Sequence, residues 1–474
     1  NKKIQSIYSY FRALDKREVL GKRICYEKRR TLPRIPAAFR TSFSRSSELT
    51  VPDLNLKVIK KIFPYFKPLI VWSVLLGILL EFSMRFYLHE LPYKLLNHTT
   101  GPIRRLGQYS KREVIPKDYL AIVGDSHAYG LGPWLYANSW SWGQPDFATH
   151  HLLHSKIKED VISYGYPGYG NFGSCLTSVS EYNFVSESSF WPKLAEPKLV
   201  FLFFYEGNDL INNLHEIEQR GFDITRISNH EAKDEIGILL EAEARKLDKH
   251  LSGFDHLVSW NLFSNLYDNY SLRLQTTVTD VHPKNINNFG DLLEIDNDPN
   301  KDLVNIALIQ GKGIDLGYSE GPALLLTDQE VSLSMEVFKQ SLAYMKKSLP
   351  SSKIAVIYLP SSLSIYKFKS QHLRPAPLVM KGERRNRLFA PADAVKNNHK
   401  LRNIVENITN SLGLKFIDSS DSLKEIAKQT LLHGPSDPIH FNREGYLAFS
   451  KAILPEVKIL CKAAGVPPPS HSKN

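Results

Sequence analysis

The sequence predicts an α/β fold in which helices cover both faces of a parallel sheet. Short runs rich in β-branched and aromatic residues alternate with longer stretches of helical periodicity, as in strand–helix–strand units. The run at 198–207, KLVFLFFYEG, is almost continuously apolar, as expected for a strand buried on both faces. Glycine and small polar residues directly follow several of these runs, at the sheet edge where α/β proteins usually place their sites.

The expected elements follow from these patterns. Strands are predicted at 119–125, 160–165, 198–207, 353–360 and 414–418, and helices at 328–349, at 397–413 and after Asn442. Residues 212–327 interrupt the alternation with a charged amphipathic helix, an aromatic-rich stretch and loops rich in Asn, Asp and Gly. We therefore expect one domain at 117–462 that carries an insertion at 212–327 on the carboxyl edge of its sheet, followed by a tail at 463–474.

Charge is concentrated at the start of the chain. The net charge of the 474 residues is +11, and residues 1–60 carry 15 Lys/Arg against 5 Asp/Glu, or +10, which leaves +1 for the rest. The body is thus nearly neutral and is not a general nucleic-acid binder. Residues 1–60 read as a basic, weakly ordered arm. A nucleic-acid-binding tail is the alternative, but aromatic residues do not alternate with the basic ones, so no nucleic-acid partner is expected.

An apolar stretch after this arm predicts a membrane helix. Residues 68–80 read PLIVWSVLLGILL, and the span extends over 62–87 if Lys67, Glu81 and Arg85 reach toward the interfaces. A buried helix is the alternative for so short a run. Lysines 57, 60, 61 and 67 lie on its N-terminal side, which places the N-terminus in the cytoplasm and the domain outside, periplasmic or extracellular. Residues 88–116 are then expected to form a linker.

Cysteine and histidine patterns point to no metal site. Only Cys175 and Cys461 could share an oxidising compartment, so one disulfide at most is possible and none is required. The histidines at 150, 151 and 154 have helical spacing, which suits either a metal site or a polar helix face. The polar face is favoured because no nearby Asp, Glu or Cys completes a ligand set. We expect neither a metal nor another cofactor.

Four groups of residues at the expected strand ends could form one catalytic site. Ser126 follows the first strand in Gly124-Asp125-Ser126-His127, and a glycine-rich loop at 165–173 follows the second. Asn208 follows the third strand, and Asp437 and His440 lie just before the last helix. The carboxylate of Asp437 is close enough in sequence to hold one imidazole nitrogen while the other nitrogen faces a serine. Taken singly, each group also suits an ordinary turn, flexible loop or helix cap.

In this combination the sequence resembles the SGNH hydrolases, also called the GDSL esterase/lipase family. The matching blocks are 124–126, the glycine loop 165–170, 207–209 and 437–440, within 117–210 and 350–462. The resemblance implies a flavodoxin-like three-layer α/β/α fold with Ser126 as nucleophile, His440 as general base and Asp437 orienting it. It also implies an oxyanion hole formed by the backbone N–H of Ser126, the backbone N–H of Gly168 and the side chain of Asn208, with Gly170 as the alternative to Gly168.

His127 stands where the family name has leucine, and the resulting block resembles SGNH domains attached to membrane acyltransferases of surface polysaccharides. The expected function is that of a membrane-anchored serine esterase acting on an acyl ester, foremost an O-acetyl ester, of a carbohydrate or lipid. Two alternatives stay open. The acyl group could pass to a sugar hydroxyl, which would make the protein an O-acyltransferase or the partner of a membrane acyltransferase complex. The domain could instead be inactive and bind carbohydrate or protein.

Overall fold

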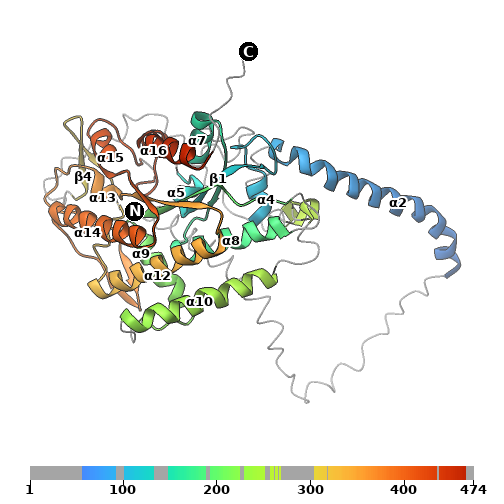
Figure 1. Ribbon diagram of the computed structural model, residues 1–474, viewed down its shortest axis with the longest axis horizontal. Coiled ribbons are helices and arrows are strands. Elements are labelled where there is room, and N and C mark those ends of the chain that lie inside the picture. Colours follow the sequence, from blue (N-terminus) through green and yellow to red (C-terminus); the bar gives the residue numbers. More distant parts are fainter. Residues whose placement is uncertain are drawn as a thin grey trace, which may run out of the picture. The chain divides into compact units, whose positions relative to one another are not determined.

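The computed structural model describes residues 56–91, 101–132, 148–187, 193–224, 229–250, 257–260, 262–264, 266–267, 304–317, 319–434 and 437–465 (Figure 1). The chain divides into two units, Asn1–Ile78 and Leu79–Asn474. Most of the predicted arm at 1–60 and of the tail at 463–474 lies outside the described residues, as does much of the predicted insertion.

A five-stranded parallel sheet forms the centre of the second unit. Its strands are β1 (Tyr119–Gly124), β2 (Asp160–Gly165), β3 (Leu199–Tyr205), β6 (Lys353–Leu359) and β9 (Lys415–Asp418). Their order across the sheet is β2-β1-β3-β6-β9, and every neighbouring pair is parallel. The parallel sheet predicted from the sequence is confirmed, and all five of its strands lie where the apolar runs placed them. This order brings the C-terminal end of β1 between those of β2 and β3.

Helices cover both faces of this sheet and give three layers (Figure 1). One face packs against α8 (Asn171–Glu187), α9 (Asp209–Gln219), α12 (Asp328–Ser348) and α14 (Pro391–Ser411), and α10 (Asn229–His250) packs on the outside of α8 and α12. The other packs against α7 (Thr149–Ile157), α15 (Ser420–Ala427) and α16 (Arg443–Ala463). Alternate side chains of β3 enter the two cores, with Phe204 on the first face and Phe203 on the second. Burial on both faces explains why this strand is almost wholly apolar.

Part of the predicted insertion belongs to the layered domain. Helix α10 packs on α12 through Ile236 and Leu240, which are buried in the core of the first face. The hairpin of β4 (Ile306–Ile309) and β5 (Lys312–Asp315) packs on the second face through Ala307. A second hairpin, β7 (Leu378–Met380) and β8 (Glu383–Arg385), and the short helix α13 (Ser362–Ile365) follow β6. The insertion therefore contributes to the core as well as to loops.

The segment expected as a linker is partly built into the domain. It includes the 3-10 turn η2 (Leu88–Glu90) and α4 (Gly101–Leu106), and Ile103 and Leu106 are buried in the core. Residues after α4 run along the free edge of β2, where the N–H of Val161 donates to the carbonyl of Ser110 at 2.8 Å. Covering this edge removes a row of unpaired backbone groups. The folded domain thus includes residues N-terminal to the boundary predicted at 117.

Helix α2 (Leu56–Tyr87) holds the apolar stretch expected to be the anchor. Its residues from Pro68, continued by η2 to Glu90, are long and apolar enough to cross a membrane by length and composition. Large apolar side chains of this stretch are exposed, including Trp72 at 69% and Leu76 at 66%. Exposure of this kind is what a lipid-facing helix requires and a core helix lacks.

The two cysteines of the domain occupy separate cores. Cys175 lies on α8 in the first core and Cys461 on α16 in the second. Both thiols are free and buried, so the one disulfide that the sequence allowed is not formed.

Candidate active site

The turn after β1 presents Ser126 at the carboxyl edge of the sheet. The strand ends at Gly124, and Ser126 is the first residue of the short helix α5 (Ser126–Tyr129). Asp125 caps this helix, because its Oδ1 accepts a hydrogen bond from the N–H of His127 at 2.9 Å. The Asp125 carboxylate also lies 3.4 Å from Ser126 Oγ. A strand that turns at once into a helix leaves the serine hydroxyl at the tip of the turn.

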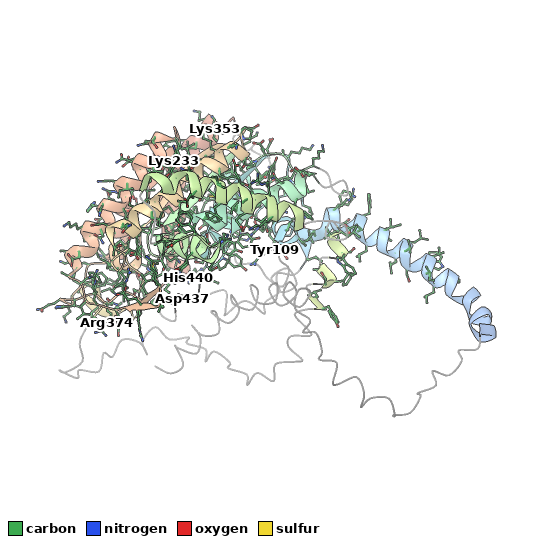
Figure 2. All side chains as sticks on the ribbon, turned by 90° about the horizontal axis from the view of Figure 1, so that it is seen from below. Tyr109, Lys233, Lys353, Arg374, Asp437 and His440 are labelled. Atoms are coloured by element: carbon green, nitrogen blue, oxygen red, sulfur yellow. The ribbon has the colours of Figure 1, made fainter. Side chains whose placement is uncertain are left out.

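The loop before α16 brings a histidine and a carboxylate to this serine. His440 Nε2 lies 2.9 Å from Ser126 Oγ, although 314 positions separate the two residues in the chain. His440 Nδ1 lies 2.6 Å from Asp437 Oδ2. Figure 2 shows Asp437 and His440 side by side at the edge of the domain. The structure therefore joins the three predicted residues in one hydrogen-bonded chain with the imidazole in the middle.

Backbone contacts hold the Asp437 side chain in place. Its Oδ1 accepts hydrogen bonds from the N–H groups of Ile439 and His440, each at 3.1 Å. The two carboxylate oxygens thus have different partners, the backbone for Oδ1 and the imidazole for Oδ2. Asn442 caps α16 directly after the loop by accepting from the N–H of Gly445 at 2.9 Å. The loop geometry consequently depends little on the imidazole itself.

Asp437 and His440 stabilise each other's charged forms. Burial by itself would raise the pKa of Asp437, but His440 and the two backbone donors lower it to about 2. Burial would likewise lower the pKa of His440, yet the Asp437 carboxylate outweighs burial and raises the pKa above 6.5. An imidazole with a raised pKa takes up a proton more readily, which is the property a general base needs.

Backbone and amide donors lie at the neighbouring strand ends. Within the described part of the chain, the N–H groups of Ser126 and Gly168 donate no hydrogen bond. Gly168 is exposed and has a φ of +81°, a conformation that favours glycine. Asn208 is half-buried just after β3, and its Oδ1 is buried with no hydrogen-bond partner in the structure. All three residues follow adjacent strands, because β1 pairs with both β2 and β3.

The N–H of Gly170, the alternative donor to the oxyanion hole, already donates to another residue. This N–H donates to Glu216 Oε1 at 2.8 Å, and the N–H of Gly173 donates to Glu216 Oε2 at 2.6 Å. A side chain at Gly170 would also collide with Asn213, whose Oδ1 would lie 2.5 Å from the added Cβ. The structure therefore leaves Gly168 as the glycine with a free N–H and assigns Gly170 to holding the end of the loop.

A buried ion pair fixes the other end of the glycine loop. Arg105 of α4 is 3% exposed and contacts Glu181 of α8 through Nε and Oε2 at 2.8 Å. Its other two nitrogens donate to the carbonyls of Ser163 at 3.0 Å and Gly165 at 3.2 Å. The Tyr166 hydroxyl donates to the second oxygen of Glu181. Arg105 thus ties the end of β2 and the start of the loop to two helices, a role that no sequence motif indicated.

Glu320 is a further ionisable residue of the site that the sequence patterns did not reveal. It is half-buried near the end of the insertion, and its Oε2 is buried without a hydrogen-bond partner in the structure. Burial raises the pKa of its carboxyl to about 7, and Asp125 adds to the rise while His440 opposes it. The carboxyl is thus electrostatically coupled to the imidazole of the site. No motif marks Glu320 because its neighbours in sequence are not at a strand end of the sheet.

Aromatic rings surround the imidazole of His127. Its ring centroid lies 4.1 Å from that of Tyr205, 5.3 Å from that of His440 and 5.5 Å from that of Phe441. The side chain is 1% exposed, and its Nδ1 lies 3.4 Å from Asp125 Oδ2. The buried His127 ring therefore packs against the ring of His440 and belongs to the core next to the Ser126–His440–Asp437 hydrogen bonds.

The histidines at 150, 151 and 154 form no metal cluster, and no group suited to a metal occurs anywhere among the described residues. His154 Nδ1 lies 2.6 Å from the carbonyl of Glu159. His150 is only 6% exposed, and its ring lies 4.4 Å from that of His151. The start of α7 is therefore buried in part and is not the solvent-exposed polar face expected from the sequence. Burial lowers the pKa of both imidazoles, which are neutral near pH 7.

Comparison with known proteins finds no match, neither among protein-family models nor among curated sequences. The motifs of the chain and the geometry of this site therefore carry the functional conclusion.

Proposed function

We propose that the protein is a serine ester hydrolase of the SGNH type, held at a membrane by α2. The observation that carries the proposal is the hydrogen-bonded chain from Ser126 Oγ through His440 to Asp437, with distances of 2.9 and 2.6 Å. A serine hydroxyl is a weak nucleophile until a base takes its proton, and a base within hydrogen-bond reach meets the geometric requirement.

In the proposed reaction Ser126 Oγ attacks the ester carbonyl carbon while its proton passes to His440 Nε2. The carbonyl oxygen becomes an oxyanion, for which the N–H groups of Ser126 and Gly168 and the side chain of Asn208 are the proposed donors. The C–O bond to the alcohol then breaks, and the alcohol leaves with the proton from His440. Water, activated by the same imidazole, attacks the acyl-serine and releases the acid. Asp437 stabilises the imidazolium at both stages.

The proposed substrate is an acyl ester, foremost an O-acetyl ester, of a carbohydrate or lipid outside the cytoplasm. Support for the location comes from α2, the one helix in the described part of the chain that is long and apolar enough to cross a membrane, and from the lysines on its N-terminal side. The proposed site needs no metal or organic cofactor, because each step is a proton transfer or an acyl transfer that protein groups can perform.

The test compares the full chain with Ser126→Ala, both solubilised in detergent, for acetate release from p-nitrophenyl acetate and from acetylated sugars. Ser155→Ala, at an exposed position of α7, is the matched control. We expect the wild type and the control to be active and labelled by a serine-directed phosphonate, and Ser126→Ala to show neither property while keeping its circular dichroism spectrum. A folded wild type that neither turns over nor reacts with the phosphonate would contradict the proposal.

A second arm separates hydrolysis from transfer. The same assay is repeated with an added oligosaccharide acceptor, and the products are identified by mass spectrometry. Hydrolysis predicts acetate as the main product at every acceptor concentration. Acetylated oligosaccharide that replaces acetate in proportion to the acceptor would assign the same residues to an acyltransferase.

A further inference from the structure

Three large aromatic side chains of one short segment are exposed on the domain. Trp260, Phe263 and Tyr267 are 53%, 56% and 71% exposed. They belong to residues 257–267, here called the aromatic segment, whose described positions from 258 onward are helical. Their spacing of three and four residues puts them on one face of the helix. Val258 and Leu262, on the opposite face, are buried at 0% and 6% exposure.

The aromatic segment is attached to the C-terminal part of α2. Glu81 of α2 accepts hydrogen bonds from the N–H of Val258 at 2.9 Å and from the N–H and hydroxyl of Ser259 at 2.9 and 2.8 Å. Figure 2 shows the segment, in yellow-green, next to the end of α2 that joins the domain. The Glu81 carboxylate therefore fixes the start of the aromatic segment to the point where α2 enters the domain, since Leu88 a few residues later is fully buried.

The span expected at 62–87 is longer than a bilayer requires, so its outer boundary can fall at this attachment point. A helix needs about 20 residues to cross a hydrocarbon core of about 30 Å. An interval of about 20 residues that ends at Glu81 begins at Ile62, directly after Lys60 and Lys61, and Lys67 near its start can reach back toward the interface. Glu81 then lies at the outer boundary of the hydrocarbon, and the aromatic segment begins at the same level.

We propose that the aromatic segment lies in the lipid–water interface beside the anchor, with Trp260, Phe263 and Tyr267 in contact with lipid. Tryptophan and tyrosine favour this region because their rings are largely apolar while the N–H and O–H groups stay near water. Phe82, Phe86 and Tyr87 are also exposed, so the exposed apolar residues of α2 extend along the helix past Glu81. This continuity with the proposed span favours lipid over a protein partner as the occupant.

A second contact with the membrane would restrict how the domain moves about its anchor. A domain held by one helix can tilt, whereas one held by a helix and an adjoining interfacial segment keeps one face toward the bilayer. The proposal rests on the membrane anchor of the proposed function but not on the esterase chemistry.

The test uses the full chain reconstituted in phosphatidylcholine vesicles, with single spin labels on a Cys25→Ser background that retains the buried Cys175 and Cys461. Labels are placed at Phe263→Cys in the aromatic segment, at Leu75→Cys in the anchor and at Ile238→Cys, an apolar position of α10 that is 66% exposed. The measured quantity is the ratio of label accessibility to oxygen, which concentrates in lipid, over that to a water-soluble nickel complex. Hydrolysis of p-nitrophenyl acetate is measured for each labelled protein as a separate readout.

We expect the ratio at position 263 to be severalfold higher than at 238 and close to that at 75. A ratio at 263 equal to that at 238, with a lipid-like ratio at 75, would overturn the proposal and leave the anchor intact. Dipolar broadening between labels at 263 that disappears on dilution with unlabelled protein would assign the face to a second copy of the chain. Low accessibility of the label at 263 to both reagents would mean that another segment of the same chain covers the aromatic face. A water-like ratio at 75 would reject the anchor together with the proposal, whatever the esterase readout shows.

Discussion

Replacing Asp437 by asparagine should remove most of the activity without disturbing the loop that carries it. The Oδ1 atom of the new side chain can still accept the hydrogen bonds from Ile439 and His440 that the carboxylate accepts now, each at 3.1 Å. The amide NH2 group then takes the position of Oδ2, which lies 2.6 Å from His440 Nδ1. Because an amide nitrogen only donates, Nδ1 must become the acceptor and the ring proton moves to Nε2. In that tautomer Nε2 cannot take the proton of Ser126.

The expected loss of kcat in Asp437→Asn has two causes. Burial by itself would raise the pKa of Asp437, but His440 and the backbone donors lower it from 3.8 to about 2, a net stabilisation of the charged form of about 2 kcal/mol. Losing a stabilisation of that size in the transition state would lower kcat by a factor of about 30. The unfavourable tautomer lowers it further, and the same change in a Ser-His-Asp protease triad costs about 10,000-fold. We therefore expect a loss between about 30-fold and about 10,000-fold.

The assay is the pH dependence of kcat/KM for p-nitrophenyl acetate between pH 5 and 9. The wild-type rate should rise through the pKa of His440, and the acid limb of Asp437→Asn should move to lower pH because the charge that raises this pKa is gone. Asp418→Asn, which removes a more exposed carboxylate paired with Arg402, is the control and should behave like the wild type. A variant at 437 with wild-type kcat and an unmoved acid limb would refute the role given to Asp437.

Three further changes probe the surroundings of the hydrogen-bonded chain. Asn208→Ala should lower kcat by about 100- to 1,000-fold with an unchanged thermal unfolding midpoint, since one oxyanion donor is worth about that much; an unchanged kcat would exclude Asn208 from the hole. Glu320→Gln should move the acid limb of kcat/KM to lower pH, because ionisation of this carboxyl raises the pKa of His440; an unmoved limb would mean that the two groups are not coupled. Arg105→Gln should lower the free energy of unfolding in urea by about 3–5 kcal/mol, because the Glu181 carboxylate would be left buried without its cationic partner. Arg112→Gln, which breaks an ion pair whose arginine is 65% exposed, should cost less than about 1 kcal/mol, and equal effects of the two arginine changes would contradict this account.

Local sequence patterns were enough to predict the strands, the parallel sheet and the residues at its edge. Burial on both faces demands continuous apolar runs, so β1 and β3 were visible as local patterns. The turn at Ser126 and the loop with Asp437 and His440 were visible because glycine, proline and polar residues follow or precede regular elements directly. Such signals are local, since periodicity and turn chemistry depend on residues close together in the chain.

Which of these residues lie close together depends on long-range packing, which local patterns do not contain. The strand order brings Ser126 within 2.9 Å of His440 across 314 positions, and periodicity contains no information about that distance. The hydrogen bond from Gly170 to Glu216 distinguished two glycines that look alike in sequence. Arg105 and Glu320 entered the site from segments read as a linker and an insertion, because their importance comes from partners distant in the chain. Local chemistry thus determined the elements, and long-range packing of buried polar groups decided how they form one site.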